Sequence, residues 1–276
     1  MVATDLDGTL LPLLLDGSQT LAASTVSATR ILRDMGIMVI VVTGRMYRSA
    51  ARFAHELGLQ GPVVAYQGAL IQDTRTGQIL HHDPVPLDLT AEVLALLEPR
   101  GHTINLYVDD ELCVAQRNEE VVRYESISGM SARAVGPLRD FLNTPTTKIG
   151  VTGEPTVLDE LLQELRAAYG DHLSALKTWP FFLEIASASA TKARALQILG
   201  GLLGFSAQEV LAFGDSYNDA DMLAWAGTGV AMMGAPPEVL ESADATCESV
   251  EDDGFARYLS RQPWFPAGRR GSTGRT

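Results

Sequence analysis

The sequence predicts an α/β fold: a parallel sheet wound with helices, with a second α+β unit inserted between its two halves. Strand-like and helix-like segments alternate over residues 2–68, and the same alternation resumes after residue 190. Such alternation is the signature of parallel strands joined by right-handed crossovers. The run "IMVIVVTG" (37–44) is continuously apolar, as is typical of a strand covered on both faces.

The first part of the chain supplies the beginning of this sheet. Its elements are predicted from apolar runs, from the helical spacing of apolar residues and from glycine stops. They are a strand at 2–6, a helix at 24–35, a strand at 37–44, a helix at 47–58, a strand at 62–68 and two strands around a polar turn within 69–82.

The order of predicted helices and strands changes after the prolines of "DPVPLD" (83–88), and these prolines suit a domain boundary. Residues 87–183 mix helices with paired strands, which indicates an inserted α+β unit. Its predicted elements are a helix from about 87, strands at 103–109 and 111–116, a helix near 118–127, a strand at 147–153, a helix at 155–170 and strands at 173–179 and 181–186.

The wound pattern then resumes and completes the sheet. Its predicted elements are a helix at 191–204, a strand at 209–215, a helix at 218–227, a short strand at 229–233 and a last helix near 253–260. We therefore expect a core domain formed by 1–84 and 185–276 and an inserted domain formed by 85–184. Residues 266–276 are expected to be a disordered tail of the core domain.

Composition limits the class of protein and its partners. The 276 residues are 46% hydrophobic, which is enough for a sizeable core. The net charge of -13 disfavours nucleic acid and anionic membranes as partners. No apolar stretch reaches the roughly 18 residues of a membrane span, and aspartates interrupt the first apolar run, so we expect no signal peptide. Cys113 and Cys247 lack metal-ligand spacing and predict reduced thiols in a cytoplasmic protein.

Four segments end predicted strands, or begin the helices that follow, with polar residues: "TDLDGT" (4–9), "VVTGR" (41–45), the start of "TKARAL" (191–196) and "FGDSYND" (213–219). In a parallel wound sheet, reactive groups collect beyond the carboxyl ends of the strands. Asp5 and Asp7 repel each other unless a cation or a shared proton offsets their charge, and Asp215 is expected to reach the same cation. Carboxylate oxygens suit Mg²⁺.

The other polar residues of these segments suit an anion. Thr43 and Gly44 precede a helix, where a hydroxyl and free backbone N–H groups form an anion site. Lys192, at the start of a helix, adds positive charge. Arg45 either contacts substrate or belongs to a solvated helix face.

In these motifs the sequence resembles the haloacid dehalogenase-like superfamily of phosphohydrolases, and within it the Cof-type sugar-phosphate and cofactor phosphatases. "DLDGTLL" and "GDSYNDADML" carry the resemblance as a pair, with "YQGALI", "LYVDDELCV" and the C-terminal "GVAMMGAPPEVLESADATCESVEDDGFARYL" beside them. The resemblance covers nearly the whole chain. It implies a Rossmann-like parallel-sheet core and an inserted cap that closes over the site and selects the leaving group.

The resemblance also implies a role for each residue. Asp5 is the nucleophile that forms an aspartyl-phosphate, and Asp7 is the acid and base. Mg²⁺ is held by Asp5, the backbone carbonyl of Asp7 and Asp215. The residues that hold the phosphoryl oxygens are Leu6 (through the backbone after Asp5), Thr43, Gly44, Lys192 and Asn218. Asp219 orients Lys192 or a metal-bound water, and Arg45 has a supporting role.

The sequence departs from the family pattern at a few positions. Gln67 stands where Asn is common, Ala193 where Gly is usual, and "GAPPE" replaces a commoner Gly-Asn-Ala. Gln67 and Ala193 border the expected site, so they bear on the substrate and not on the reaction.

We expect a phosphatase of a small phosphorylated metabolite, such as a sugar phosphate, pyridoxal phosphate or FMN, that acts as a monomer or small homo-oligomer. A hexose phosphomutase and a binding or regulatory module without catalysis stay as alternatives, because fold resemblance alone does not separate them.

Overall fold

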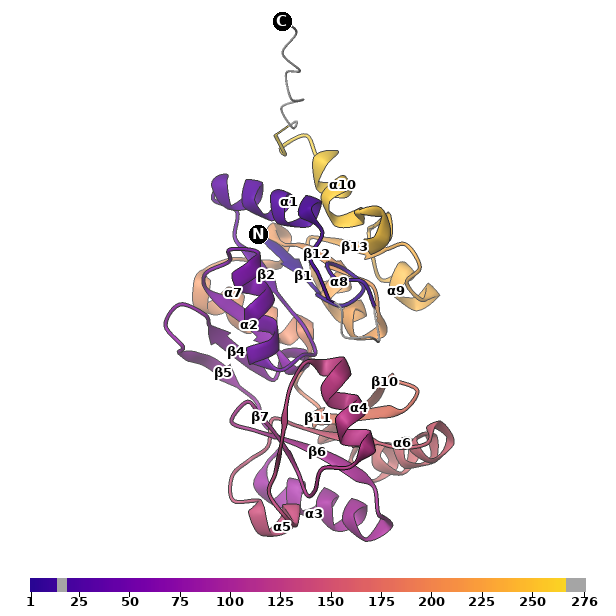
Figure 1. Cartoon of the computed structure of the whole chain (residues 1–276). Coiled ribbons are helices and arrows are strands. Elements are labelled where there is room, and N and C mark those ends of the chain that lie inside the picture. Colours follow the sequence, from indigo (N-terminus) through magenta and orange to yellow (C-terminus); the bar gives the residue numbers. More distant parts are fainter. Residues whose placement is uncertain (14–18, 267–276) are drawn as a thin grey trace, which may run out of the picture.

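The computed structural model describes residues 1–13 and 19–266 (Figure 1). The tail expected from the sequence lies, from residue 267 onward, outside the described residues. The predicted α/β class with a parallel sheet at its centre is confirmed. In Figure 1 the parallel sheet and its helices form the upper half of the molecule, and a second sheet with its own helices forms the lower half.

The upper half contains a five-stranded sheet in the order β14-β13-β12-β1-β2, and every neighbouring pair is parallel. Its strands are β1 (Val2–Thr4), β2 (Val39–Val41), β12 (Leu211–Gly214), β13 (Thr228–Met232) and β14 (Ala245–Cys247). Val2 is in register with Val39 on one side and with Leu211 on the other, so β1 lies between β2 and β12. The polar segment after β1 therefore lies between those that follow β2 and β12.

Helices cover both faces of this sheet. The helices around it are α1 (Ala23–Asp34), α2 (Tyr47–Glu56), α7 (Lys192–Leu203), α8 (Ala220–Trp225), α9 (Pro237–Glu241) and α10 (Gly254–Ser260). Side chains of α1, α2 and α10 pack with Val2 and Val41 in one apolar cluster. Side chains of α7, α8 and α9 pack with Ala3 and Ile40 in another. Alternate residues of a strand thus pack in the two apolar clusters on opposite faces of the sheet. This explains why the strand sequences are continuously apolar.

A smaller antiparallel sheet corrects one prediction. The strand expected at 62–68 in the parallel sheet is β3 (Pro62–Ala65), and it pairs antiparallel with β4 (Leu70–Asp73), which pairs with β5 (Ile79–His82). A single parallel bridge, between Val42 and Val64, joins β3 to the end of the parallel sheet. The hairpin turns back at once after β3, so β3 is hydrogen-bonded along its length to β4 on one side, while on the other side Val64 O accepts from the N–H of Thr43 (2.9 Å).

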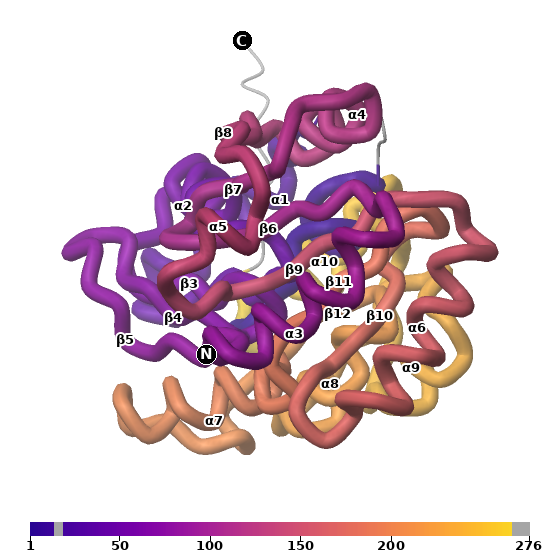
Figure 2. The backbone as a smooth tube through the Cα atoms, turned by 90° about the horizontal axis from the view of Figure 1, so that it is seen from below, coloured from indigo at the N-terminus to yellow at the C-terminus, as the bar shows by residue number. Residues whose placement is uncertain are grey.

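The lower half contains a six-stranded sheet in the order β10-β11-β9-β6-β7-β8, and Figure 2 shows its strands side by side. Its strands are β6 (Thr103–Val108), β7 (Glu111–Val114), β8 (Ala132–Ala134), β9 (Lys148–Thr152), β10 (Leu173–Trp179) and β11 (Phe182–Ser187). The helices of this half are α3 (Leu87–Leu97), α4 (Glu119–Ser128), α5 (Leu138–Phe141) and α6 (Pro155–Tyr169). Short 3-10 turns lie at Tyr66–Gly68, Glu98–Arg100, Ala207–Glu209, Tyr217–Asp219 and Val250–Asp252.

The two faces of the six-stranded sheet have different partners. Leu106, Ile149 and Leu183 pack with α3 and α6 on one face. Tyr107 and Phe182 lie in a cluster with Tyr124 of α4 and with residues of the upper half. This second face therefore looks toward the parallel sheet.

Two chain segments connect the halves, between β5 and α3 and between β11 and α7. They are joined by a hydrogen bond from Ser189 Oγ to the carboxylate of Asp83. The division into domains at 84/85 and 184/185 stays a prediction, and its second limit falls within β11. No helix in the described part of the chain combines the length and apolar character needed to cross a membrane.

Candidate active site

Asp5, Lys192 and Asp219 form a buried ionic cluster at the carboxyl end of the parallel sheet. Asp5 follows β1, and its N–H donates to Phe213 O of β12 (3.0 Å). Lys192, the first residue of α7, donates from Nζ to Oδ1 of Asp5 (2.7 Å) and to Oδ1 of Asp219 (2.6 Å). The side chains of Lys192 and Asp219 are 0% exposed, so water does not screen these ion pairs. One ammonium therefore joins the segments after β1 and β12.

Asp215 lies beside this cluster and is fitted against the turn that follows Asp5. Its Oδ1 accepts a hydrogen bond from Thr9 Oγ1 (3.0 Å). Gly8 has a φ of 82°, and a Cβ there would collide with the Asp215 carboxylate. Asp219 also fixes the Asp215 segment, because its Oδ2 accepts from the N–H groups of Asp215 (3.1 Å) and Ser216 (3.0 Å). The structure therefore explains two residues of "DLDGT": Gly8 leaves room for the Asp215 carboxylate, and Thr9 donates a hydrogen bond to it.

Negative charge exceeds positive charge in this cluster. Burial raises the pKa of Asp5 well above its ordinary value, and the charges of Asp219 and Asp215 raise it further against the effect of Lys192. Burial, followed by the charge of Asp219, raises the pKa of Asp215 to about 7. Burial lowers the pKa of Lys192, but Asp219 and Asp5 together raise it by more, so its ammonium stays charged.

The donor set fits a hard divalent cation. Oxygen atoms of Asp5, Asp215 and Asp219 lie within 4.8 Å of one another. Burial and the neighbouring carboxylates raise the pKa values of Asp5 and Asp215, and a bound cation would stabilise the charged forms of both. Carboxylate oxygens without nitrogen or sulfur ligands suit Mg²⁺. The residues predicted from the sequence to bind metal through side chains, Asp5 and Asp215, both belong to this group.

The side chain of Asp7 lies outside the group and is bound by Arg45. Arg45 Nε donates to Oδ2 of Asp7 (2.6 Å), and its Nη2 donates to Oδ1. Arg45 also donates to Gln19 Oε1 (2.7 Å) and lies over the ring of Phe53. The Arg45 side chain is 13% exposed, so it is not part of a solvated helix face. The backbone carbonyl of Asp7 stays a predicted metal ligand.

The turn after β2 places Thr43 and Gly44 beside Gln67. The N–H of Gln67 donates to Thr43 O (3.0 Å), and a Cβ on Gly44 would collide with the Gln67 amide. Oε1 of Gln67 accepts from Nδ2 of Asn218 (2.9 Å). Gln67, one of the departures from the family pattern, therefore links two predicted phosphate-binding segments.

Two further positions singled out in the sequence, Leu6 and Ala193, lie in segments that border the cluster. The Leu6 side chain is buried in the core, and its carbonyl accepts from Leu10 (2.9 Å) and Leu11 (2.8 Å), so its N–H is the group it can offer to a phosphate. The N–H of Ala193 donates to Asp221 Oδ2 (3.2 Å).

Sequence reasoning missed the residues through which the lower half meets the site. Lys148 of β9 donates from Nζ to Gly44 O (3.2 Å) and to Glu184 Oε1 (2.7 Å). Asp110, at the tip of the β6–β7 hairpin, accepts from the N–H groups of Tyr47 and Arg48 (both 2.9 Å) at the start of α2. A lysine inside the apolar run "TKIGVTG" was the available signal for Lys148.

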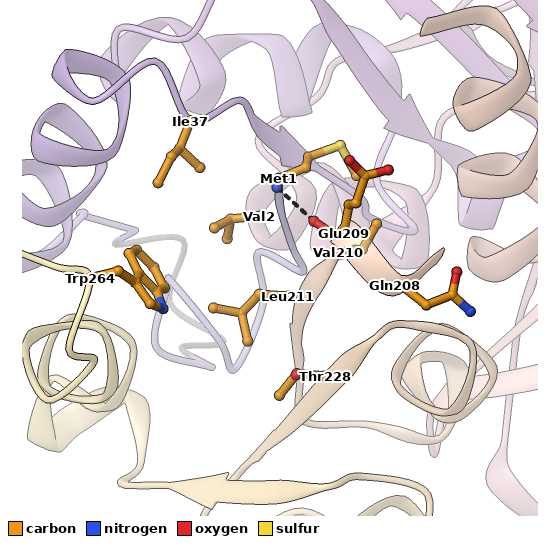
Figure 3. Close-up of a pocket in the computed structure, with 9 residues that line it drawn as sticks. All are labelled: Met1, Val2, Ile37, Gln208, Glu209, Val210, Leu211, Thr228 and Trp264. Atoms are coloured by element: carbon orange, nitrogen blue, oxygen red, sulfur yellow. Dashed lines mark hydrogen bonds between the residues drawn. The ribbon is translucent and has the colours of Figure 1, made fainter. Parts of the chain in front are cut away.

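A separate pocket lies at the opposite end of the parallel strands (Figure 3). It has a volume of about 240 Å³ and is lined by residues at or just before the starts of β1, β12 and β13, with Ile37 and Trp264. It contains none of the site residues predicted from the sequence.

Comparison with known proteins gives matches over nearly the whole chain. Residues 2–259 match the family of haloacid dehalogenase-like hydrolases. The 5-amino-6-(5-phospho-D-ribitylamino)uracil phosphatase YitU of Bacillus subtilis is 29% identical over 266 residues, which cover 94% of this chain and 96% of the relative. The pyridoxal phosphate phosphatase YbhA of Escherichia coli is 27% identical, with 94% and 97% covered.

Solved structures show the same fold. A haloacid dehalogenase-like hydrolase from Bacteroides thetaiotaomicron superposes with a TM-score of 0.86 at 24% identity, covering 94% of this chain and 98% of the other. The structure of TM0651 from Thermotoga maritima gives a TM-score of 0.84 at 27% identity, with 95% and 96% covered.

These matches extend over both sheets and so include the inserted unit. They confirm the predicted resemblance and the prediction of a phosphoric monoester hydrolase, since the relatives are named phosphatases. The chain belongs to the haloacid dehalogenase-like hydrolases.

Proposed function

We propose that this chain is a Mg²⁺-dependent phosphatase that hydrolyses the phosphate monoester of a small metabolite through an aspartyl-phosphate on Asp5. The observation that carries the proposal is the buried cluster in which Lys192 joins Asp5 to Asp219, with Asp215 alongside. Relatives named as phosphatases of a ribitylaminouracil phosphate and of pyridoxal phosphate support the class of substrate.

Asp5 is the nucleophile in this proposal. Its Oδ1 accepts from Lys192, which leaves Oδ2 as the oxygen that attacks phosphorus. The new Oδ2–P bond forms as the bond from phosphorus to the leaving oxygen breaks. A bound Mg²⁺, held by Asp5, Asp215 and the backbone carbonyl of Asp7, would offset the repulsion between the carboxylate and the phosphate dianion.

Asp7 moves the protons. In the first step its carboxyl donates a proton to the leaving oxygen, and in the second its carboxylate takes a proton from the water that attacks the aspartyl-phosphate. Inorganic phosphate leaves, and Asp5 and Asp7 return to their starting states. Arg45 donates to both carboxylate oxygens of Asp7, so proton transfer requires Arg45 to move away from them. The 33% exposure of the Asp7 side chain leaves it accessible to substrate.

Thr43, Gly44, Lys192, Asn218 and the N–H of Leu6 hold the phosphoryl oxygens. Their task is positioning and charge stabilisation, on which phosphoryl transfer mainly depends. Asp219 keeps Lys192 aimed at Asp5. A cytoplasmic location and a monomeric or small homo-oligomeric state stay predictions.

A phosphate-release assay over a panel of phosphate monoesters tests the proposal. We expect release that requires Mg²⁺ and stops when a chelator is added. Phosphate release at an unchanged rate in the presence of the chelator would contradict the proposal, as would the absence of release from every ester. Release without an added sugar bisphosphate would also count against the hexose phosphomutase alternative.

A further inference from the structure

Two consecutive residues in the turn after β3 have a left-handed backbone conformation. Tyr66 has a φ of 52° and Gln67 has a φ of 59°, and both side chains are buried. Asparagine and aspartate tolerate this conformation, but it is strained for tyrosine and glutamine. Strained residues persist only where the surrounding structure holds them, and they gather at functional sites. The strain therefore points to a task for this turn.

Contacts with two segments of the candidate active site hold the turn in place. The N–H of Gln67 donates to Thr43 O (3.0 Å), in the turn proposed to hold phosphate. The next residue, Gly68, packs against the backbone of Thr191 so closely that a Cβ would collide with Thr191 O. Thr191 directly precedes Lys192. The backbone of Gln67 is therefore fixed between the segments that carry Thr43 and Lys192.

The side-chain amide of Gln67 extends from this fixed point to Asn218. Its Nε2 lies against Gly44, where it occupies the space that a Cβ would need, and its Oε1 accepts from Nδ2 of Asn218 (2.9 Å). An amide nitrogen carries two hydrogens. Gln67 accepts one of them, which leaves the other as the hydrogen that Asn218 donates to a phosphoryl oxygen. A side chain with one methylene fewer, on the same backbone, does not reach Asn218.

On the basis of the phosphatase function proposed above, we propose that Gln67 is a positioning residue that orients the Asn218 amide toward the transferred phosphoryl group. Gln67 then acts on the reaction only through Asn218. Phosphoryl transfer depends on donors that are already placed when the transition state forms, so an amide free to rotate stabilises it less. Every substrate carries the phosphoryl group, so the effect of Gln67 is the same for esters with different leaving groups.

The test compares Gln67→Asn with Gln67→Met. The first keeps an amide but shortens the side chain, and the second keeps the length but removes the amide, so both lose the bond to Asn218. We expect kcat/KM to fall about tenfold in both variants, and by the same factor for p-nitrophenyl phosphate and acetyl phosphate. Gln72→Met is the matched control. Nε2 of Gln72 donates to Gly77 O (2.9 Å) in the β4–β5 hairpin, so its loss should leave kcat/KM unchanged.

A double-mutant cycle shows whether Gln67 acts through Asn218. In the Asn218→Ala background, Gln67→Met should change kcat/KM by less than about twofold, because the group that Gln67 orients is already absent. The full tenfold loss in this background would overturn the proposal, since Gln67 would then act on the substrate by itself. A loss confined to one of the two esters would also overturn it, because Gln67 would then act on the leaving group.

Thermal stability separates positioning from a structural role. Both Gln67 variants lose the same hydrogen bond, but only asparagine suits the left-handed backbone, so the melting temperature of Gln67→Asn should exceed that of Gln67→Met. Their kcat/KM values should nevertheless be equally low. Activity that followed the melting temperature, with Gln67→Asn close to the wild type, would overturn the positioning role. Failure of the wild type to hydrolyse either ester would instead overturn the proposed function.

Discussion

Arg45 binds the carboxylate of Asp7 through two parallel hydrogen bonds, and this pair lies at the edge of the Asp5 cluster without joining it. The two carboxylates of "DLD" therefore have different surroundings. Asp5 is buried against Lys192, whereas Asp7 is one-third exposed and paired with a guanidinium that also contacts Gln19. Different surroundings suit the two different tasks proposed for them, attack on phosphorus and proton transfer.

The first prediction separates these two tasks with p-nitrophenyl phosphate, whose leaving group departs without needing a proton. In Asp7→Asn we expect a rapid burst of about one p-nitrophenolate per protein molecule, followed by turnover at least about 100-fold slower than wild type, because the base for the second step is missing. Stopped-flow absorbance measures both phases. Asp5→Asn is the matched variant and should give no burst. A burst in Asp5→Asn, or none in Asp7→Asn, would contradict the assignment.

The second prediction concerns the metal. Saturating Mg²⁺, at about 100 times its Kd, should stabilise the chelator-treated protein by about 2.7 kcal/mol and raise its melting temperature. Asp215→Asn removes a carboxylate of the group, so the Mg²⁺-dependent rise should be largely lost. Asp171→Asn, at an exposed aspartate, is the control and should respond as wild type does. An equal rise in the wild type and Asp215→Asn would show that the cation binds elsewhere.

The third prediction concerns Lys192. Lys192→Met keeps most of the side-chain volume but leaves Asp5 and Asp219 without their buried counter-charge. Because the pKa of Lys192 is raised above its ordinary value of 10.5, the lysine is fully charged at neutral pH and the whole effect is expected there. We expect the free energy of unfolding to fall by about 3 kcal/mol in urea titrations, with loss of phosphatase activity. A fall of less than about 1 kcal/mol in the free energy of unfolding would mean that these ion pairs do not stabilise the fold.

The fourth prediction concerns the contact between the β6–β7 hairpin and α2. Asp110 accepts from Tyr47 N and Arg48 N and from the hydroxyl of Tyr66 (2.7 Å), and α2 has no capping side chain of its own. Asp110→Asn places an amide donor against these N–H groups. It should cost about 1 kcal/mol of unfolding free energy.

The neighbouring Asp109→Asn is the control for this contact. Asp109 and Asp110 both have positive φ, which asparagine tolerates, but Asp109 is exposed. Its unfolding free energy should change by less than about 0.5 kcal/mol. Equal effects in the two variants would show that the Asp110 hydrogen bonds do not stabilise the protein.

Strong local patterns predicted the elements that build the parallel sheet. Apolar runs indicated β2 and β12, and helical spacing with glycine stops indicated α1 and α2. The sequence did not predict α9 and β14, which are short and have few apolar residues, or β8 and α5 in the inserted unit. These elements depend on tertiary contacts, which leave no periodic signal.

Some residues of the candidate site could likewise be predicted from the sequence, and others could not. Motifs that end strands identified Asp5 and Asp215, because parallel strands bring their carboxyl ends together. A motif that begins a helix identified Lys192. The pairing of Lys148 with Gly44 and Glu184 joins positions 36 to 104 residues apart, and only the fold reveals it. The bond from Asn218 to Gln67 is of the same kind.

The central claim is that Asp5 carries the phosphoryl group during turnover. Rapid mixing with substrate and Mg²⁺, acid quenching and peptide mass spectrometry test it directly. We predict one phosphoryl group on the peptide that contains Asp5, formed within the first turnover and absent from Asp5→Asn. Turnover without a phosphorylated peptide, or with the phosphoryl group on another residue, would contradict the account.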